Sequence, residues 1–343
     1  MHYLITGHTG FKGTWLSAML LAKGHKVSGI SLDPEPKSLF NHANIKNGFE
    51  HDFRIDIRDS NLLSSAVQDI KPEVVIHLAA QPLVRRSYAE PVLTFETNFG
   101  GTLNLLSAVS LINSVKACLI ITTDKVYRDT NLKTSYLETD PLGGSDPYSA
   151  SKSAADILTQ SWIKSIPTPP MAVARAGNVI GGGDWSLDRL VPDSVTAILS
   201  GKDLILRNPD AVRPWQHVLD CLNGYLLLVE SLLSQNTDAT WNFGPLPESN
   251  RTVKDVVEGI IKNWEATDTK VRIETDKNQL KESNFLLLDS TKSREKLGWI
   301  DKLDFNETLR WTTEWYKAHS EGESAEALVR NQISKFLTLN PKK

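Results

Sequence analysis

The sequence predicts an α/β protein with a doubly wound parallel sheet of the Rossmann type and a smaller C-terminal α/β lid. Short apolar runs alternate with helical patterns up to residue 177, and the first run, HYLIT at 2–6, leads directly into glycines. After residue 177 this alternation stops. Strands that are apolar on both sides are typical of a parallel sheet with helices on both faces, which is the doubly wound arrangement.

The first part of the chain divides into expected strands and helices. Strands are expected at 2–6, 26–31, 52–55, 73–79, 115–123 and 170–176. Helices are expected at 15–23, 60–70, 91–111 and 146–164. Gly24 suits the C-terminal cap of the first helix, while Asp146 and Pro147 suit the N-cap and first position of the last one. We expect residues 1–177 to form one sheet domain.

The second part is richer in Gly, Pro, Arg and aromatic residues, as in GNVIGGGDW and RNPDAVRPWQHV. Helical patterns return at 218–234, 252–264 and 305–319. Because no linker separates the two parts, residues 178–320 are expected to form mainly a lid on the sheet domain, with segments that could return to the sheet. The glycines at 181–183 could form a pocket loop or a flexible turn. Residues 321–343 are charged and are expected to be a poorly ordered tail.

Composition limits the possible partners of this chain. It has 343 residues, of which 40% are hydrophobic and 23% are charged, with a formal net charge of −3. That balance is ordinary for a globular protein and gives no reason to expect nucleic acid or an anionic membrane as a partner. The two cysteines, Cys118 and Cys221, form neither a disulfide framework nor a zinc spacing, and no metal is expected. The lack of a membrane-spanning run or a signal-peptide pattern makes the cytoplasm the default location.

The segment TGHTGFKG has glycines at a G-x-x-G-x-x-G spacing between a strand and an amphipathic helix. Glycine allows a tight turn and lets backbone N–H groups approach a pyrophosphate at a helix N-terminus. A tight turn without a ligand is the alternative. The expected cofactor-binding residues of this loop are Gly7, Gly10, Phe11, Lys12 and Gly13.

The ends of the next strands suggest which dinucleotide binds. Ser31 stands where an acid often binds the adenosine ribose, Asp33 follows two residues later, and no arginine stands there to hold a 2′-phosphate. This favours NAD over NADP. Further expected contacts are Asp56 and Ile57 at the adenine edge, or as a solvated strand end, and the small apolar residues Leu78, Ala79 and Ala80.

Tyr148 and Lys152 lie four residues apart and therefore share one face of the expected helix. A nearby ammonium favours the phenolate, and a tyrosine tuned in this way can take a proton from a sugar hydroxyl as hydride leaves. Thr123, at the end of the preceding strand, is placed to bond the same hydroxyl. The alternative is a helix face with a surface-reaching lysine. The neighbours Asp124 and Lys125 could be solvated charges or a proton donor and acceptor.

These motifs resemble the extended short-chain dehydrogenase/reductase family, in its NAD-dependent epimerase/dehydratase branch. The resemblance rests on TGHTGFKG, HLAAQPLVRRSY, TTDKVY, DPYSASK, ARAGNVIGGGDW and RPWQHV, and extends to LDSTKSREKLGW at 288–299. Within the family, the Asp-Lys pair is most similar to that of 4,6-dehydratases acting on CDP-glucose. Epimerases usually lack an acid and a base there, and dTDP-glucose dehydratases typically carry Asp-Glu. Ala150 departs from a frequent asparagine without touching the proposed chemistry.

The resemblance implies a three-step reaction with NAD. Tyr148 takes the C4 hydroxyl proton while hydride goes to NAD, Lys125 removes the C5 proton, and Asp124 protonates the leaving C6 hydroxyl. Hydride then returns to C6 and gives a 4-keto-6-deoxy sugar nucleotide. Asp124 and Lys125 must both be uncharged or share one proton. Burial favours the uncharged forms and mutual attraction opposes them, so the sequence leaves the outcome open.

The resemblance also implies contacts to a nucleotide-diphosphate sugar and a homodimer or higher homo-oligomer. The implied substrate residues are Gln81, Ser87, Asn178, Arg189, Arg207 and Arg213. For Arg86 or Arg207, the sequence is equally compatible with a surface ion pair and with a contact to substrate. The segments 91–111 and 146–164 are the candidates for a four-helix dimer interface. Two other functions stay open: an epimerase or dehydratase for another nucleotide sugar, and a non-catalytic dinucleotide sensor.

Overall fold

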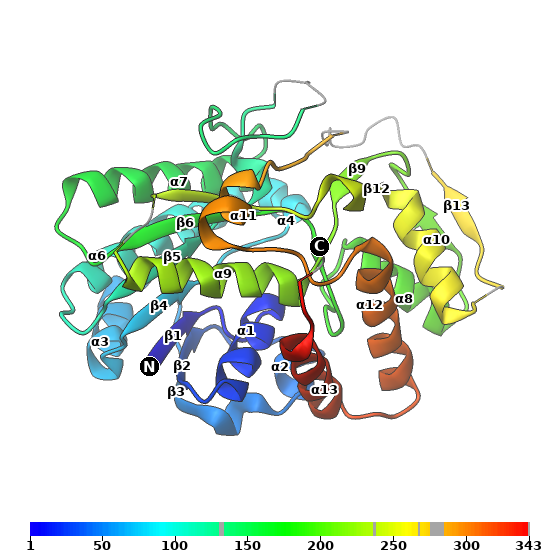
Figure 1. The fold of residues 1–343 in the computed structure, drawn as a ribbon, viewed down its shortest axis with the longest axis horizontal. Coiled ribbons are helices and arrows are strands. Elements are labelled where there is room, and N and C mark those ends of the chain that lie inside the picture. Colours follow the sequence, from blue (N-terminus) through cyan, green and yellow to red (C-terminus); the bar gives the residue numbers. More distant parts are fainter. Residues whose placement is uncertain (130–133, 236–237, 267, 275–284, 342–343) are drawn as a thin grey trace.

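A seven-stranded parallel sheet forms the centre of the molecule (Figure 1). The computed structural model describes residues 1–129, 134–235, 238–266, 268–274 and 285–341. The strand order is β11-β6-β5-β4-β1-β2-β3. These strands are β1 (His2–Thr6), β2 (Lys26–Ser31), β3 (Phe49–Arg54), β4 (Val74–His77), β5 (Ala117–Ile121), β6 (Met171–Ala176) and β11 (Thr240–Phe243). The predicted doubly wound sheet is confirmed, and its order reverses between β1 and β4, where ligands bind in this class of sheet.

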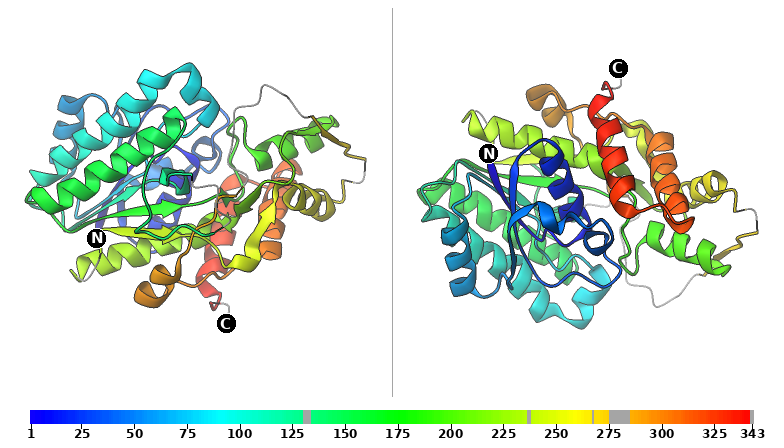
Figure 2. Two further views of the ribbon diagram at one scale, coloured as in Figure 1. Left: turned by 90° about the horizontal axis from the view of Figure 1, so that it is seen from above. Right: turned by 90° about the horizontal axis from the view of Figure 1, so that it is seen from below.

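Helices cover both faces of the sheet in two layers (Figure 2). On one face lie α3 (Ser60–Ile70), α6 (Gly101–Ser110) and α7 (Pro147–Ser165), and on the other lie α1 (Phe11–Ala22) and α9 (Val218–Leu233). Neighbouring residues of β1 show why both layers are needed. Leu4 belongs to the core under the first layer, whereas Tyr3 and Ile5 belong to the core under the second. Alternate side chains of a strand point to opposite faces, so an apolar strand requires a cover on each side.

A smaller lobe lies beside the carboxyl ends of the strands, at the right of Figure 1. Its strands are the pairs β7 (Val179–Ile180) with β10 (Gln216–His217), β8 (Leu204–Leu206) with β13 (Val271–Ile273), and β9 (Val212–Pro214) with β12 (Asn250–Thr252). Its helices are α8 (Leu190–Ser200), α10 (Val253–Trp264) and α12 (Phe305–Ser320). Short elements elsewhere are α2 (Leu39–His42), η1 (Ile45–Gly48), η3 (Asp124–Val126), η4 (Pro247–Ser249) and α11 (Thr291–Leu297). Both α9 and β11 return to the sheet domain, so the chain crosses between the two parts more than once.

The helix predicted over 91–111 contains a wide π-helical turn. It consists of α5 (Pro91–Phe95), the π turn η2 (Glu96–Gly100) and α6, and α4 (Val84–Ala89) precedes it. In the π turn, Asn98 Oδ1 accepts from the Gln81 amide at 2.8 Å, and Asn98 Nδ2 donates to the Gln81 carbonyl at 3.1 Å. Such turns are frequent at functional sites. Here the turn ties the helix to the loop that follows β4.

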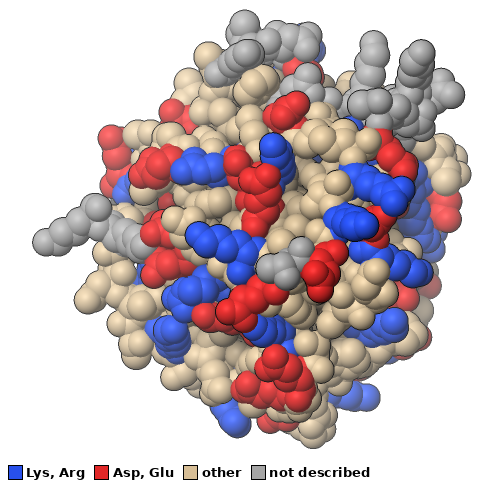
Figure 3. Space-filling view, turned by 90° about the vertical axis from the view of Figure 1, so that its right-hand side faces the viewer, with Lys and Arg blue, Asp and Glu red and all other residues tan. Residues whose placement is uncertain are grey.

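Charged side chains of both signs are mixed over the face drawn in Figure 3. This face shows no broad area of a single sign among the described residues, which is consistent with the small net charge of the chain. None of the described helices combines the length and apolar character that crossing a membrane requires. Nor do the described residues bring three or more His, Cys, Asp or Glu side chains into a group that could hold a metal.

The prediction of a poorly ordered tail after residue 320 is wrong for most of that segment. Residues Ala325–Thr338 form α13, with Ser324 as its N-cap. Leu328, Val329, Ile333 and Phe336 are buried in the core that includes α1. They recur at helical spacing, so the helix has one apolar face despite its charged residues. The apolar surface of α1 supplies the partner that makes this helix stable.

Truncating the buried end of α13 should therefore destabilise the whole domain. Phe336 is 0% exposed, and the Phe336→Ala change should lower the free energy of unfolding by about 3 kcal/mol, because it leaves a cavity in the core. Denaturant unfolding followed by circular dichroism measures the effect. The matched control is Leu337→Ala, at a side chain that is 38% exposed, with an expected change of about 0.5 kcal/mol or less. Equal small effects from both changes would contradict the docking of α13.

Candidate active site

The glycine loop between β1 and α1 is closed against the loop that follows β4. Gly7 has φ +75°, and a Cβ there would lie 2.7 Å from the Ala79 nitrogen. A Cβ at Gly13 would lie 2.1 Å from the Gly7 carbonyl oxygen. Gly10 is the N-cap of α1 and provides no side-chain acceptor for the amides of the first turn. The loop thus forms a cradle of backbone at a helix N-terminus, which fits the pyrophosphate of a dinucleotide.

The cradle opens into a cavity of about 1040 Å³ between the sheet and the smaller lobe. The predicted site residues that line it are Gly7, Gly10, Phe11, Lys12, Gly13, Ser31, Asp56, Ile57, Leu78, Ala79, Ala80, Gln81, Thr123, Asp124, Lys125, Tyr148, Lys152, Asn178, Arg189, Arg207 and Arg213. The structure does not bring Ser87 to this cavity. Its hydroxyl is buried within α4 and donates to the Val84 carbonyl at 2.6 Å.

The strand ends near the glycine loop hold their polar groups in local pairs. The Ser31 hydroxyl lies 2.6 Å from the Thr9 hydroxyl of the glycine loop. Asp56 accepts from the Arg58 guanidinium at 2.6 Å, and this contact lowers the pKa of the carboxyl group. Asp56 therefore stays ionised at the cavity edge, where Ile57 lies beside it.

An arginine does stand near the end of β2, contrary to the reading of the sequence. Arg54 ends β3 and pairs in register with Ser31, and its Nε lies 3.5 Å from Asp33 Oδ1. Both Arg54 η-nitrogens donate to Asp52. The prediction that no arginine stands near the end of β2 is therefore wrong, although Asp33 and Asp52 already partner the Arg54 guanidinium. Arg54 does not line the cavity, whereas Ser31 does.

Tyr148, Lys152 and Thr123 meet where β5 ends against α7. The Asp146 carboxylate caps α7 by accepting from the Ser149 amide at 2.9 Å, so the predicted N-cap is confirmed. Lys152 Nζ donates to the Ile121 carbonyl at 2.8 Å. Burial lowers the pKa of Lys152 to about 8 and raises that of Tyr148 to about 12. Tyr148 is half-buried and lines the cavity.

The expectation that Lys152 depresses the pKa of Tyr148 needs revision. Burial is the largest influence and moves the tyrosine pKa upward, while a hydrogen bond with Thr123 and the charge of Arg189 lower it. The Lys152 ammonium is held by a main-chain carbonyl instead. Among the influences that lower the pKa of Tyr148 and so favour the phenolate, the hydrogen bond with Thr123 is the largest.

Asp124 is 3% exposed and lies at the start of the short 3-10 helix that follows β5. Its Oδ1 accepts from the Thr123 hydroxyl at 2.9 Å. Its Oδ2 is buried and has no hydrogen-bond partner among the described residues. Burial raises the pKa of Asp124 and outweighs the opposing attraction of Lys125. For the acid, burial therefore shifts the balance toward the protonated form.

The arginines expected to bind substrate come from the smaller lobe and line the same cavity. Arg213 on β9 is 6% exposed, and its positive charge lowers the pKa of Asp124, which places it near that carboxyl. Arg189 lies 3.4 Å from Asp184 Oδ2. Arg207, which is about half-exposed, lies 3.6 Å from Asp188 Oδ1. The surface ion pair considered for Arg207 is therefore present, and it sits at the cavity wall.

Two further predicted positions have defined surroundings. The Gln81 side chain donates to the Thr94 hydroxyl at 2.9 Å and accepts from the Leu83 amide at 2.7 Å. Its amide group is therefore held by its own loop. Of the three consecutive glycines, Gly181 lines the cavity, whereas Gly182 packs against the ring of Trp315. The run is partly a pocket loop and partly a close packing contact.

Sequence reasoning missed charged residues that only the fold brings together. Arg85, from α4 of the sheet domain, lies 3.1 Å from Asp188 Oδ1, just before α8 of the smaller lobe, and both residues line the cavity. The adjacent arginines in VRRSY were a signal for Arg85, but nothing in the sequence marked Asp188. Asp156 and Arg175 form a buried ion pair next to Thr122. The spacing of Asp156, four residues after Lys152, could have indicated its place on the same helix face.

Comparisons with known proteins agree with this geometry. The family model described as GDP-mannose 4,6 dehydratase matches residues 4–312. A CDP-glucose 4,6-dehydratase of Salmonella typhimurium is 39% identical, over 97% of this chain and 95% of that protein. The dTDP-glucose 4,6-dehydratase of Bacillus anthracis, solved in complex with NAD, superimposes with a TM-score of 0.80 at 25% identity, over 94% of this chain and 98% of that one. The resemblance found in the sequence is thereby confirmed, and the chain belongs to the GDP-mannose 4,6 dehydratase family.

Proposed function

We propose that this chain is a nucleotide-sugar 4,6-dehydratase that converts CDP-glucose to CDP-4-keto-6-deoxyglucose. The observation that carries the proposal is the buried Asp124 carboxyl, which has an unpartnered Oδ2 and stands between Thr123 and Lys125. An oxidation or a C4 inversion needs no such acid, whereas loss of water needs a proton for the leaving hydroxyl. The 39% identity to a CDP-glucose 4,6-dehydratase supports CDP-glucose as the substrate.

NAD is the cofactor that we propose for this site. The backbone cradle at Gly7 and Gly13 would hold the pyrophosphate, Ser31 the adenosine ribose, and Lys152 the nicotinamide ribose. When bound, NAD supplies the capacity to accept a hydride from the sugar and to return it later. The residues of the chain supply the proton transfers and the alignment.

Tyr148 is the proposed base for the C4 hydroxyl. Its pKa of about 12 means that the phenolate must be stabilised as it forms. The Thr123 hydroxyl provides this stabilisation by donating to the phenolate oxygen. Lys152 has a pKa of about 8, so its ammonium is largely protonated near neutral pH, where it is proposed to hold the nicotinamide ribose.

Oxidation at C4 acidifies the C5 proton and makes water loss possible. We propose Lys125 as the base at C5 and protonated Asp124 as the acid at the C6 hydroxyl. Asp124 is suited to this role because burial raises its pKa and because its Oδ2 faces no protein donor among the described residues. Arg213, Arg189 and Asn178 line the same cavity and are proposed to bind the diphosphate and the sugar.

We further infer that two copies of this chain associate through α5, η2 and α7. These elements pack against one another, and together with α4 they leave large apolar side chains exposed to solvent. The exposed residues of this face are Tyr88, Val92, Phe95, Phe99 and Ile157. Burial of such a face against a second copy would remove it from water.

Incubation with CDP-, dTDP-, GDP- and UDP-glucose tests the reaction and the nucleotide. We expect a 4-keto-6-deoxy product from CDP-glucose, with solvent deuterium incorporated at C5, because the C5 proton is exchanged during elimination. Mass spectrometry and NMR of the product measure both features. A C4-inverted sugar that has lost no water would exclude a dehydratase, and preferential conversion of another nucleotide would move the substrate away from CDP-glucose.

The Asp124→Asn variant should separate the two half-reactions. Loss of the proton donor should slow water elimination by about 100-fold or more, a typical effect of removing general acid catalysis. Oxidation should continue, so a 4-keto hexose nucleotide and reduced cofactor accumulate, as measured by cofactor absorbance. The contrasting variant is Tyr148→Phe, which should yield neither species. If Asp124→Asn eliminates water at the wild-type rate, Asp124 is not the acid.

The Val92→Glu variant should produce a monomer. Val92 is 69% exposed on α5, and a carboxylate there would have to be desolvated in the interface. Light scattering coupled to size exclusion measures the mass. The matched control is Leu62→Glu on α3, at a side chain that is 55% exposed and lies outside the proposed interface. A monomeric native chain, or dissociation by both variants alike, would count against this face.

A further inference from the structure

A fully buried ion pair joins β6 to α7 beneath the proposed active site. The side chains of Arg175 and Asp156 are 1% and 0% exposed. Arg175 Nε and Nη2 donate to the two carboxylate oxygens at 2.8 Å each. Gln160 Nε2 also donates to Asp156 Oδ1, at 2.7 Å. Two parallel bonds between planar groups allow only one relative orientation, so the pair fixes how α7 lies against β6.

The carboxylate of this pair belongs to the helix that carries the oxidation groups. Tyr148, Lys152 and Asp156 follow one another at intervals of four residues on α7 and therefore share one face. The Thr122 hydroxyl donates to Asp156 Oδ2 at 3.1 Å, and Thr122 directly precedes Thr123 in the chain. Asp156 thus binds the strand end that presents Thr123 while it stands on the helix that presents the tyrosine.

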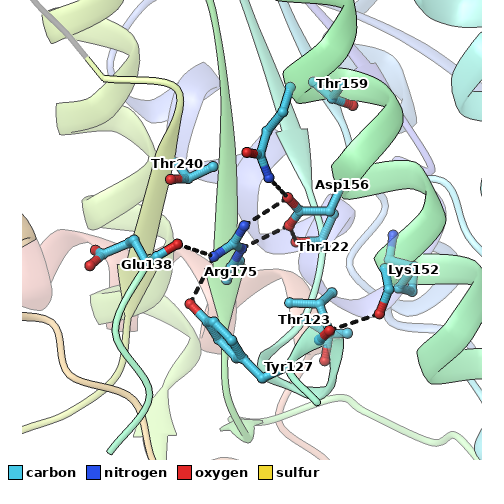
Figure 4. Close-up of polar contacts among 12 residues, drawn as sticks. Thr122, Thr123, Tyr127, Glu138, Lys152, Asp156, Thr159, Arg175 and Thr240 are labelled. Carbon is cyan, nitrogen blue, oxygen red and sulfur yellow. Dashed lines mark hydrogen bonds and ion pairs between the residues drawn. The ribbon is translucent and has the colours of Figure 1, made fainter. Parts of the chain in front are cut away.

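The third nitrogen of the guanidinium reaches the segment that carries the elimination groups (Figure 4). Arg175 Nη1 donates to the Tyr127 hydroxyl at 2.9 Å and to the Glu138 carbonyl at 3.1 Å. The Tyr127 hydroxyl in turn donates to Asn242 Oδ1 at 2.7 Å. Tyr127 is only three residues after Asp124, at the end of the short 3-10 helix. One guanidinium therefore contacts both the α7 helix and the Asp124 segment.

Stability alone gives little reason for charges at this position. Replacement of a buried ion pair by apolar residues of similar volume is often neutral or stabilising, because the charges lose their hydration. The surroundings here include an apolar stack, in which the Tyr127 and Tyr136 rings lie 4.8 Å apart and the guanidinium lies over Tyr127. Hydrocarbon side chains could fill this space, but they could not supply the directional bonds.

We propose that Arg175 and Asp156, with Tyr127, act as positioning residues that hold the oxidation groups on α7 and the elimination groups after β5 in one alignment. This inference rests on the proposed dehydratase reaction, in which both sets of groups act on neighbouring carbons of one sugar. A misplacement of about 1 Å can cost about 100-fold in rate, so a shared anchor has a direct catalytic consequence.

The Tyr127→Phe variant tests the link to the elimination groups. It keeps the ring and its stacking but removes the hydroxyl between Arg175 and Asn242. We expect KM for CDP-glucose within about 2-fold and kcat lower by about 10-fold, a fraction of the loss that a 1 Å misplacement brings. Reduced cofactor and ketone should accumulate because oxidation, still aligned by Asp156, outpaces elimination. Amide hydrogen exchange at residues 124–127 should be faster even without substrate.

The matched control is Tyr136→Phe in the same aromatic stack. The Tyr136 hydroxyl donates to the Arg128 carbonyl at 3.2 Å, whereas the Tyr127 hydroxyl contacts Arg175 and Asn242. We expect this variant to keep wild-type kcat and wild-type exchange at 124–127. If both phenylalanine variants lower kcat and the melting temperature equally, with no accumulation of ketone, the hydroxyl of Tyr127 is merely structural and the proposal is overturned.

A double variant, Asp156→Leu with Arg175→Met, tests the ion pair without leaving a buried charge unpaired. We expect a melting temperature close to that of the wild type, kcat lower by about 100-fold, and faster exchange at residues 124–127. If the double variant folds and keeps the wild-type kcat and the wild-type amide exchange, the proposal is overturned. If it does not fold, the Tyr127→Phe result alone decides whether the proposal holds. The exchange measurement separates this inference from the reaction itself, because it applies even if CDP-glucose is not the substrate.

Discussion

The Thr123 hydroxyl has one proton, and the chemistry of the site depends on where that proton points. It donates to Asp124 Oδ1 at 2.9 Å, and the same hydroxyl is a hydrogen-bond partner of the Tyr148 phenol. An ionised Asp124 would keep the proton directed at itself. A protonated Asp124 can instead donate to the threonine oxygen, which leaves the threonine proton for the phenolate. Burial raises the pKa of Asp124 and so favours its protonated form. That form can give its proton to the C6 hydroxyl during elimination, and it also leaves the Thr123 proton for the phenolate during oxidation.

Burial is therefore the common cause of the unusual proton affinities in this cavity. It raises the pKa of Asp124 and of Tyr148 and lowers that of Lys152. Lys12, from the glycine loop, opposes the effect on Asp124 and reinforces the effect on Lys152. Burial in one cavity between the sheet and the smaller lobe thus shifts an acid toward its protonated form and a lysine toward its neutral form.

The parts of this site that depend on short sequence motifs could be predicted, whereas the parts that depend on contacts between distant segments could not. The glycine loop and the four-residue spacing of Tyr148 and Lys152 are short-range signals, and both lie at the cavity. Arg54 reaches Asp33 only because β3 pairs with β2, and Ser87 is turned away within α4. The order of α13 depends on a core that includes α1, at the other end of the chain. Such contacts follow from the register of the whole fold, which no short window of sequence contains.

The same register determines whether the ion pair can reach Tyr127. Arg175 on β6 stands directly opposite Asn242 on β11, and the Tyr127 hydroxyl bridges the two side chains. Successive side chains of a strand alternate between faces, so a slip of one residue between β6 and β11 would turn one of the two partners to the opposite face. The bridge can therefore form only in the native register. The alignment of the Asp124 segment thus depends on the pairing of an edge strand that contributes no catalytic group of its own.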